Sequence, residues 1–163
     1  MDFLHTPKRT CSTGFTVVSW LCVVAWAGFI FFMSSNTGDN LDQGLGFFSS
    51  IYQIMQTIQT GLLGPGVDVL SPAAHFCEYA VFGILWVNAL YCHIPLVRAC
   101  LVAVVCVSLY GATDEIHQIF VADRMCDPAD WLVDTIGACL GASLTLFVLT
   151  VRKGARAALP GDR

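Results

Sequence analysis

Three separated segments of this sequence carry side chains that could perform acid–base chemistry or bind an anion or a metal ion. They read HFCEY, DEIHQ and RMCDPADWLVD, and together they supply two histidines, several acids, a tyrosine, a glutamine and one arginine. Histidine and carboxylate side chains are the usual general acids and bases of enzymes, and an arginine fork suits a phosphate or carboxylate group. We expect catalytic roles for His75, Glu78, Asp114, His117 and Asp130, and substrate-binding roles for Tyr79, Glu115, Gln118, Arg124 and Asp134.

Helical spacing would bring most of these side chains onto shared faces. The three polar residues of the first segment are three and four positions apart, and so are Asp114, His117 and Gln118 of the second. Residues at those spacings are neighbours on a helix, whereas the glutamate of the second segment is turned away by about a quarter turn. Asp130 and Asp134 are one turn apart. The acids and histidines could also bind a divalent metal ion, although the spacing defines no closed ligand set.

Four apolar runs must position these segments, and each is long enough to cross a membrane. They cover residues 15–33, 76–92, 96–112 and 131–151, and a bilayer core needs about 17–25 apolar residues per helix. The chain of 163 residues is 56% hydrophobic and 12% charged, which leaves nothing for a soluble domain. The sequence predicts an all-α, polytopic membrane bundle: a cytoplasmic segment over 1–14, four transmembrane helices within 15–151, and a cytoplasmic tail over 152–163.

The basic residues are distributed unequally between the two ends of these spans. Of the eight Lys and Arg residues, seven fall on one side and only Arg124 falls on the other. The positive-inside rule therefore predicts that both termini are cytoplasmic and that the three polar segments face outward. We expect no nucleic-acid partner, because the basic residues stand at helix ends where they explain orientation. The first run resembles a secretory signal at its start but continues to Met33, so we expect an uncleaved span, with a cleaved signal as the alternative.

The connection of about forty residues between the first two spans contains no Lys or Arg and should have structure of its own. Phe47, Ile51, Ile54, Ile58 and Leu62 recur within it at helical spacing. This pattern predicts a short amphipathic helix that lies on the outer leaflet or caps the bundle, followed by a break over 61–66. The connection over 91–95 is short enough to predict a helical hairpin.

Asp134 would lie about one turn inside the last span, where a carboxylate costs about 2.5–3.5 kcal/mol to insert. We therefore expect it to face protein. Gly137 and Gly141 continue the same stripe at GxxxG spacing, which lets a neighbouring helix approach closely. A polar pocket between helices, open to the outer side, would satisfy both features.

The eight cysteines contain no CxxC pair and lie mostly within the spans, so no disulfide framework is expected. Cys77 and Cys126 both lie near the outer face and could meet. We interpret them instead as small apolar packing residues.

The order of FFMSSN, HFCEYAVFG, DEIHQIFVADR and DPADWLVDTIGACLG resembles the VanZ-like family of small bacterial membrane proteins, from Phe31 to about Gly141. The resemblance implies a bacterial cytoplasmic membrane protein, and the family is named for a protein linked to resistance to the glycopeptide teicoplanin. It also implies that all ten candidate residues except His117 fall on the family's polar positions. Asp127 stands where the family is richer in serine or glycine, so we do not include it among the site residues.

Three functions fit these features. The first is an enzyme that acts at the outer leaflet on a lipid or a lipid-linked envelope precursor, with Arg124 holding an anionic headgroup and His75 or His117 as general acid or base. The second is a non-catalytic binder of an anionic amphiphile, including a lipid-tailed glycopeptide. The third is a structural or transport protein in which Asp134 belongs to a helix-assembly network or a proton relay. The sequence does not specify an oligomeric state.

Overall fold

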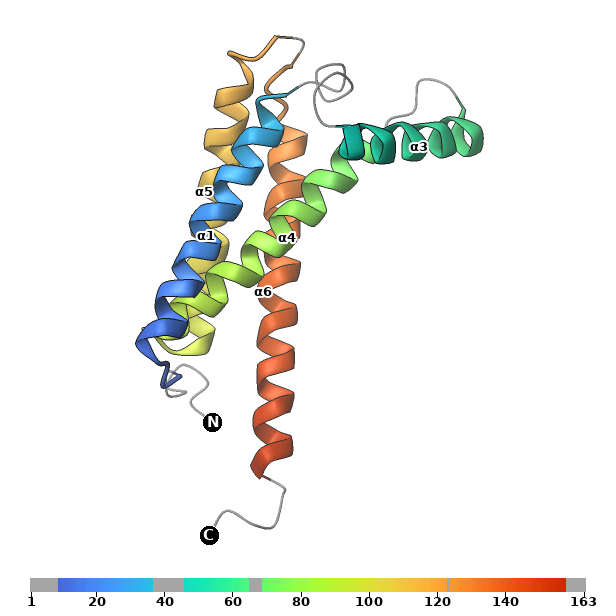
Figure 1. Cartoon of the computed structure of the whole chain (residues 1–163). Helices are drawn as coiled ribbons and strands as arrows, with labels where there is room; N and C mark the ends of the chain where they lie inside the picture. The colour runs from blue at the N-terminus through green and yellow to red at the C-terminus, as the bar shows by residue number, and fades with distance from the viewer. Residues whose placement is uncertain (1–8, 37–45, 65–68, 123, 158–163) are drawn as a thin grey trace.

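The computed structural model describes residues 9–36, 46–64, 69–122 and 124–157, and every element in this part is an α-helix. The helices, labelled as in Figure 1, are α1 (Thr13–Ser34), α3 (Gly46–Leu63), α4 (Leu70–Leu90), α5 (Leu96–Gln118) and α6 (Pro128–Ala157). Four of them are long and apolar enough to cross a membrane: Thr13–Ser34, Leu70–Leu90, Leu96–Gln118 and Pro128–Ala155. The predicted all-α bundle with four candidate membrane spans is therefore confirmed.

The helices begin and end where local hydrogen bonding allows. The side chain of Ser12 accepts a hydrogen bond from the backbone N–H of Phe15 and caps α1. Asp127 does the same for α6 by accepting from Ala129, with Pro128 as the first helical residue. The predicted hairpin between α4 and α5 is present, and α5 continues to Gln118, six residues beyond the predicted end of that span. The polar DEIHQ segment is therefore the last turn of a helix rather than part of a loop.

Helices α4 and α6 form the tightest contact in the bundle, and glycines make it possible. A Cβ atom added at Gly137 would lie 2.5 Å from the carbonyl oxygen of Phe76, and one at Gly141 would overlap the carbonyl of Ala80. From the other side, a Cβ at Gly83 would lie 2.8 Å from the carbonyl of Ala138. The two backbones therefore touch, as the GxxxG spacing predicted.

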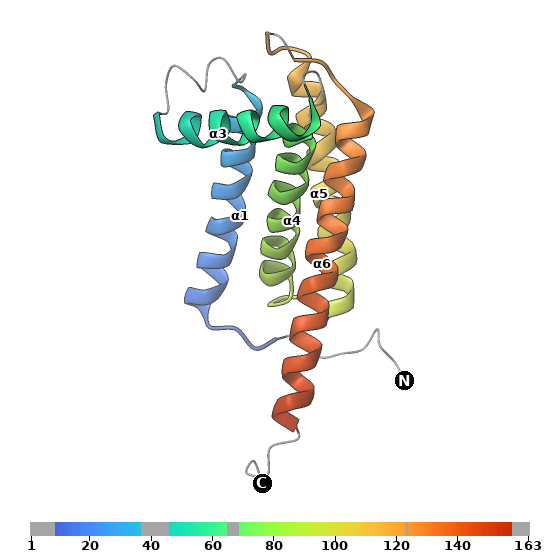
Figure 2. The ribbon, with the colours of Figure 1, turned by 90° about the vertical axis from the view of Figure 1, so that its right-hand side faces the viewer.

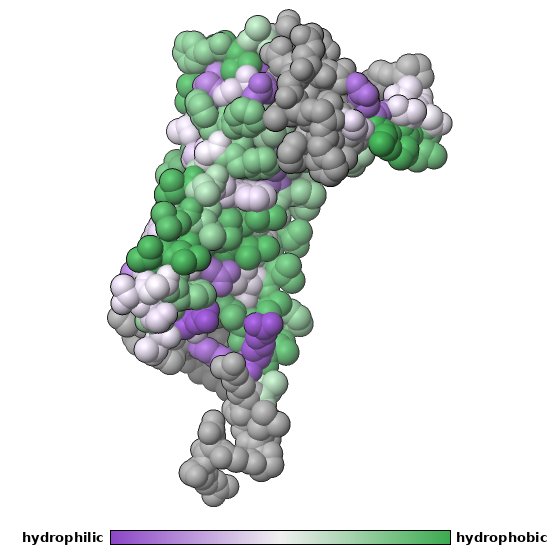
Figure 3. All heavy atoms as spheres, in the orientation of Figure 1, coloured by the Kyte–Doolittle hydropathy of each residue, from purple (hydrophilic) through white to green (hydrophobic). Residues whose placement is uncertain are grey.

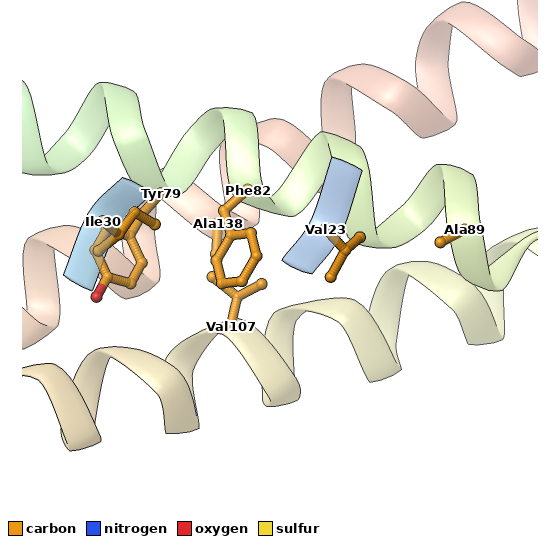
Figure 4. Close-up of a cluster of buried hydrophobic side chains, with 7 residues drawn as sticks. All are labelled: Val23, Ile30, Tyr79, Phe82, Ala89, Val107 and Ala138. Atoms are coloured by element: carbon orange, nitrogen blue, oxygen red, sulfur yellow. The ribbon is translucent and has the colours of Figure 1, made fainter. Parts of the chain in front are cut away.

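The apolar core fills the space between α1, α4, α5 and α6 (Figure 4). Tyr79 and Phe82 of α4 pack against Val107 of α5 and Ile30 of α1. Helix α1 is also held by hydrogen bonds, because the Tyr110 hydroxyl donates to the carbonyl of Ala27 at 2.7 Å. Large apolar side chains on the outward faces of the four spans remain exposed, which is the surface expected of a protein that faces lipid (Figure 3).

Helix α3 lies across one end of the bundle, roughly perpendicular to the spans and projecting to one side (Figures 1 and 2). Ile54, Ile58 and Leu62 are exposed, as the amphipathic pattern predicted, and the side chains of Phe47 and Ile51 lie outside the described residues. Gln59 joins α3 to α4, because its side-chain oxygen accepts the backbone N–H groups of Val69 and Leu70 at 3.0 and 2.8 Å. The helix ends at Leu63 and is followed by Gly64 with a φ of 88°, within the predicted break.

The sequence predicted no disulfide framework, and the structure contains one cysteine pair that this prediction did not include. Cys11 and Cys92 form a disulfide with a Cα–Cα distance of 5.6 Å. The residues before α1 run back against the α4–α5 turn, where the backbone N–H of Arg9 donates to the carbonyl of Tyr91. That path brings together two cysteines 81 positions apart, which spacing alone does not reveal. Cys77 and Cys126 are free and exposed.

The α4–α6 contact predicts a specific response to small substitutions. Gly141→Ala should destabilise the protein by about 1–3 kcal/mol, because the added methyl group meets backbone atoms that can move only if the helices separate. Gly154→Ala in the same helix is the matched control, since a Cβ there would meet nothing within 4 Å. Thermal unfolding of both variants in detergent, followed by size-exclusion chromatography, measures the difference. Equal melting temperatures for the two variants would contradict the backbone contact.

Candidate functional site

Buried polar side chains gather at the end of the bundle where α1 and α5 end and where α4 and α6 begin. Within the described residues, seven polar or charged side chains are buried, and all except Thr145 lie at this end. They are Ser34, His75, Asp114, Glu115, Gln118, Asp134 and Thr145. The predicted site residues therefore do converge, although their assignment to catalysis or binding stays a prediction.

The innermost pair is His75 of α4 and Asp134 of α6. Nδ1 of His75 lies 3.2 Å from Oδ1 of Asp134, whose side chain is 0% exposed. The prediction that Asp134 faces protein rather than lipid is confirmed. Gly111 of α5 makes room for the acid, because a Cβ there would lie 3.2 Å from Asp134 Oδ2 and equally close to the Tyr79 ring. The His75 imidazole is stacked on the Tyr79 ring, with the two ring centroids 6.5 Å apart. Nε2 of His75 has no hydrogen bond within the described part of the chain.

The Asp114 side chain lies beside the Ser34 hydroxyl and the Gln118 amide, which both act on its carboxylate. Within the described residues, however, no donor meets its two buried oxygens at full hydrogen-bond geometry, and the same holds for the Tyr79 hydroxyl and Asp134 Oδ2. Asp114 lies close enough to His75 and His117 for their charges to interact. Buried acceptors without partners are costly, so a ligand hydroxyl, an ammonium group or a water would stabilise this arrangement.

Glu115 and Asp127 organise the connection between α5 and α6. Oε2 of Glu115 accepts the backbone N–H of Asp127 at 2.7 Å, and Asp127 in turn caps α6. These contacts give Glu115 a structural task that its sequence position did not predict. Asp130 is half-buried and lies within charge-interaction range of Glu115 and Asp134.

Arg124 stands beside this cluster without an acidic partner. One of its guanidinium nitrogens donates to the carbonyl of Asn36 at 3.1 Å, and no carboxylate of the described residues lies within ion-pair distance. Glu78 is half-buried and is close enough for charge interaction with Arg124, His75 and Asp114. The guanidinium is therefore positioned by a neutral group and keeps donors for an anion.

His117, in the last turn of α5, makes its direct contacts with the end of α1. Its Nε2 lies 3.0 Å from the Oγ of Ser35, and its ring stacks on Phe31 with centroids 4.4 Å apart. The neighbouring Gln118 donates to the Oγ of Ser34 at 3.2 Å. Sequence reasoning gave the two serines no role, and the only signal for them was the polar SSN that follows the first apolar run.

A divalent metal ion, which the sequence left open as an alternative, gains no support from the geometry of the described residues. Over 9–36, 46–64, 69–122 and 124–157, no group of three or more His, Cys, Asp or Glu side chains is arranged to hold a metal ion. His75 and His117 are each engaged on one nitrogen by a different partner.

Comparisons with known proteins place this arrangement in a family. A model of the VanZ/LLP1 family matches residues 19–149, which include parts of all four candidate spans and every candidate site residue. Comparisons with curated proteins and with solved structures gave no match. Because the family match covers well over half of the sequence, the chain belongs to the VanZ/LLP1 family.

Proposed function

We propose that this protein acts on a lipid or a lipid-linked envelope molecule with an anionic headgroup, at the outer face of the bacterial cytoplasmic membrane. The observation that carries the proposal is Arg124, a guanidinium without an acidic partner in the described structure, next to a cluster that contains buried His75, Asp114 and Asp134. An arginine fork binds phosphate or carboxylate bidentately. The adjacent cluster would supply acid–base groups to the same molecule.

In this proposal His75 is a general acid or base, and Asp134 holds its ring. The Asp134 carboxylate is hydrogen-bonded to Nδ1 of His75, which leaves Nε2 as the nitrogen that can exchange a proton with a ligand. Asp114 and the Tyr79 hydroxyl offer unpaired hydrogen-bonding atoms to a polar headgroup. Glu78 and Asp130 lie around this pair and complete the charged surroundings.

Helix α3 supports a location at the depth of the lipid headgroups. Figure 3 shows its apolar side turned toward the level of the apolar spans and its polar side turned away from it. An amphipathic helix with this placement is typical of the boundary between headgroups and acyl chains. Because α3 is joined to the start of α4 through Gln59, the site beside it would lie at the same depth.

The orientation follows from charge. Arg9 and Lys153 both contact Tyr91 at the α4–α5 turn, so basic residues from distant parts of the sequence gather at the end opposite Arg124. By the positive-inside rule this end would be cytoplasmic, together with both termini. The Cys11–Cys92 disulfide of the structure would then stand on the side where thiols are usually kept reduced, so we expect the bond to be opened to two thiols in cells.

Natural cysteines allow a direct test of this orientation. A variant that retains only Cys126 should react with a membrane-impermeant maleimide in cells whose outer layers have been removed and whose cytoplasmic membrane is intact. We expect this because Cys126 is exposed and lies in the α5–α6 connection. A variant that retains only Cys92 should react only after the membrane is permeabilised. The opposite labelling pattern would place the polar cluster on the cytoplasmic side.

Removing the unpaired cation should abolish lipid chemistry. We expect one lipid species to change in membranes that overproduce the wild-type protein, and this change to be lost with Arg124→Ala or His75→Ala at matched abundance. Lys153→Ala is the control, since it removes a cation that lies over the Tyr91 ring at the other end. Lipid mass spectrometry measures the outcome. Identical profiles for all four proteins would argue against catalysis, and a lipid that co-purifies only when Arg124 is present would indicate a binder instead.

Asp134→Asn separates a chemical role from a purely structural one. The amide oxygen can still accept from His75 Nδ1, so we expect a melting temperature close to that of the wild type together with loss of the lipid change. Asp134→Ala should cost about 1–3 kcal/mol, because it leaves a buried histidine donor unpaired. Unfolding of the Asn variant under conditions in which the wild type is folded would favour the structural network.

A further inference from the structure

We propose that Ser35 is a nucleophile activated by His117, and that it attacks the phosphorus of a phosphate ester in an anionic lipid. This inference rests on the proposed function, because it gives that site a reaction class and a reacting atom. It uses a serine–histidine pair at the edge of the cluster, separate from the His75–Asp134 pair.

The two side chains are already within hydrogen-bond distance. Ser35 is the C-cap residue of α1, and its Oγ lies 3.0 Å from Nε2 of His117 in the last turn of α5. Stacking on Phe31 fixes the plane of the imidazole. A serine with a histidine at this distance is the arrangement in which the histidine acts as general base.

The exposure of the two serines distinguishes Ser35 from its neighbour. Ser34 is buried, accepts a hydrogen bond from Gln118 and lies beside the Asp114 carboxylate, and no histidine of the described residues is hydrogen-bonded to it. Ser35 and His117 are both half-buried, which leaves them open to a ligand. The Ser35 hydroxyl also lies 2.6 Å from the carbonyl of Phe31, and rotation about its Cβ–Oγ bond would turn the proton from that carbonyl to the imidazole.

Charged groups on both sides of the pair suit phosphoryl transfer. Arg124 is anchored on the carbonyl of Asn36, the residue directly after Ser35, so its free donors can bind the non-bridging oxygens of a phosphate held at Ser35. Asp114 lies one turn before His117 and interacts with its charge. It would stabilise the imidazolium that forms when the proton moves.

The reaction needs no reagent other than the lipid and water. The Ser35 hydroxyl proton passes to Nε2 of His117 as Oγ forms a bond to phosphorus. The bond from phosphorus to the ester oxygen breaks, and the departing alkoxide takes the proton from His117. Water then attacks the phosphorus of this phosphoserine and gives a proton to His117. The bond from phosphorus to Oγ breaks, Oγ takes the proton back from His117, and phosphate leaves the restored serine.

A phosphorus electrophile tests the nucleophile without knowledge of the lipid. The full-length protein in lipid vesicles is treated with an alkyne-tagged, long-chain alkyl fluorophosphonate, which forms a stable adduct with an activated serine and releases fluoride. Peptide mass spectrometry should place the adduct on Ser35. Ser35→Ala should abolish it, and His117→Gln should slow it by about 10²-fold or more, the usual contribution of a general base.

Ser19→Ala is the matched control for the serine. Ser19 lies in α1, which Ser35 caps, and its hydroxyl makes the same bond to the carbonyl four residues earlier, at 2.8 Å, but no histidine of the described residues is hydrogen-bonded to it. It should label at the wild-type rate. Size-exclusion profiles and melting temperatures show whether each variant is folded.

The outcomes separate this inference from the proposed function. Failure of the folded wild type to label, or equal labelling of Ser35→Ala or His117→Gln, would overturn the nucleophile. If the lipid change persists in Ser35→Ala but disappears in Arg124→Ala, the proposed function is supported and the role of Ser35 as nucleophile is rejected. Labelling at Ser35 that depends on His117, with no lipid change in any membrane, would support the pair and reject the proposed substrate.

Discussion

A carboxylate within a membrane-spanning helix must be covered by protein, and the structure depends on how this chain covers Asp134. Backbone contact between α4 and α6 at Gly137 and Gly141 brings the two helices together just below the acid. The same contact sets His75 of α4 opposite Asp134 of α6. Packing and polar pairing therefore support each other, since the glycines hold the helices at a distance at which the histidine reaches the carboxylate.

The cluster combines satisfied and unsatisfied groups in a way that a purely structural network does not require. Among the described residues, His75 and Glu115 have hydrogen-bond partners, whereas the buried oxygens of Asp114 meet no donor at full hydrogen-bond geometry even though Ser34 and Gln118 lie beside them. Arg124 is held by a neutral carbonyl although Glu78 lies close enough to interact with its charge. Networks that only stabilise a fold gain most when every member is paired. Unpaired donors and acceptors at the same end of the bundle instead favour a ligand that carries both an anion and hydrogen-bond donors.

Much of the fold could be predicted because membrane insertion leaves a strong pattern in the sequence. Apolar length predicted the four spans, and the spacing of Gly137, Gly141 and Asp134 predicted a close helix contact next to a buried acid. Contacts between distant segments left no such pattern. The Cys11–Cys92 bond depends on the path of the chain before α1, and the Ser35–His117 pair depends on where α1 and α5 end relative to each other. Periodicity describes the faces of one helix and does not describe which helix ends meet.

The measurement that tests the central claim most directly is a double-mutant cycle on His75→Ala and Asp134→Ala, read as the free energy of unfolding in detergent micelles. Groups in contact show interaction energies of about 0.5–3 kcal/mol, whereas independent sites are additive. The account predicts a coupling in that range, with the double variant less destabilised than the sum of the single variants, because either single change leaves a buried polar group without its partner. Additive effects would contradict the buried pair, and with it the way in which the α4–α6 contact builds the site.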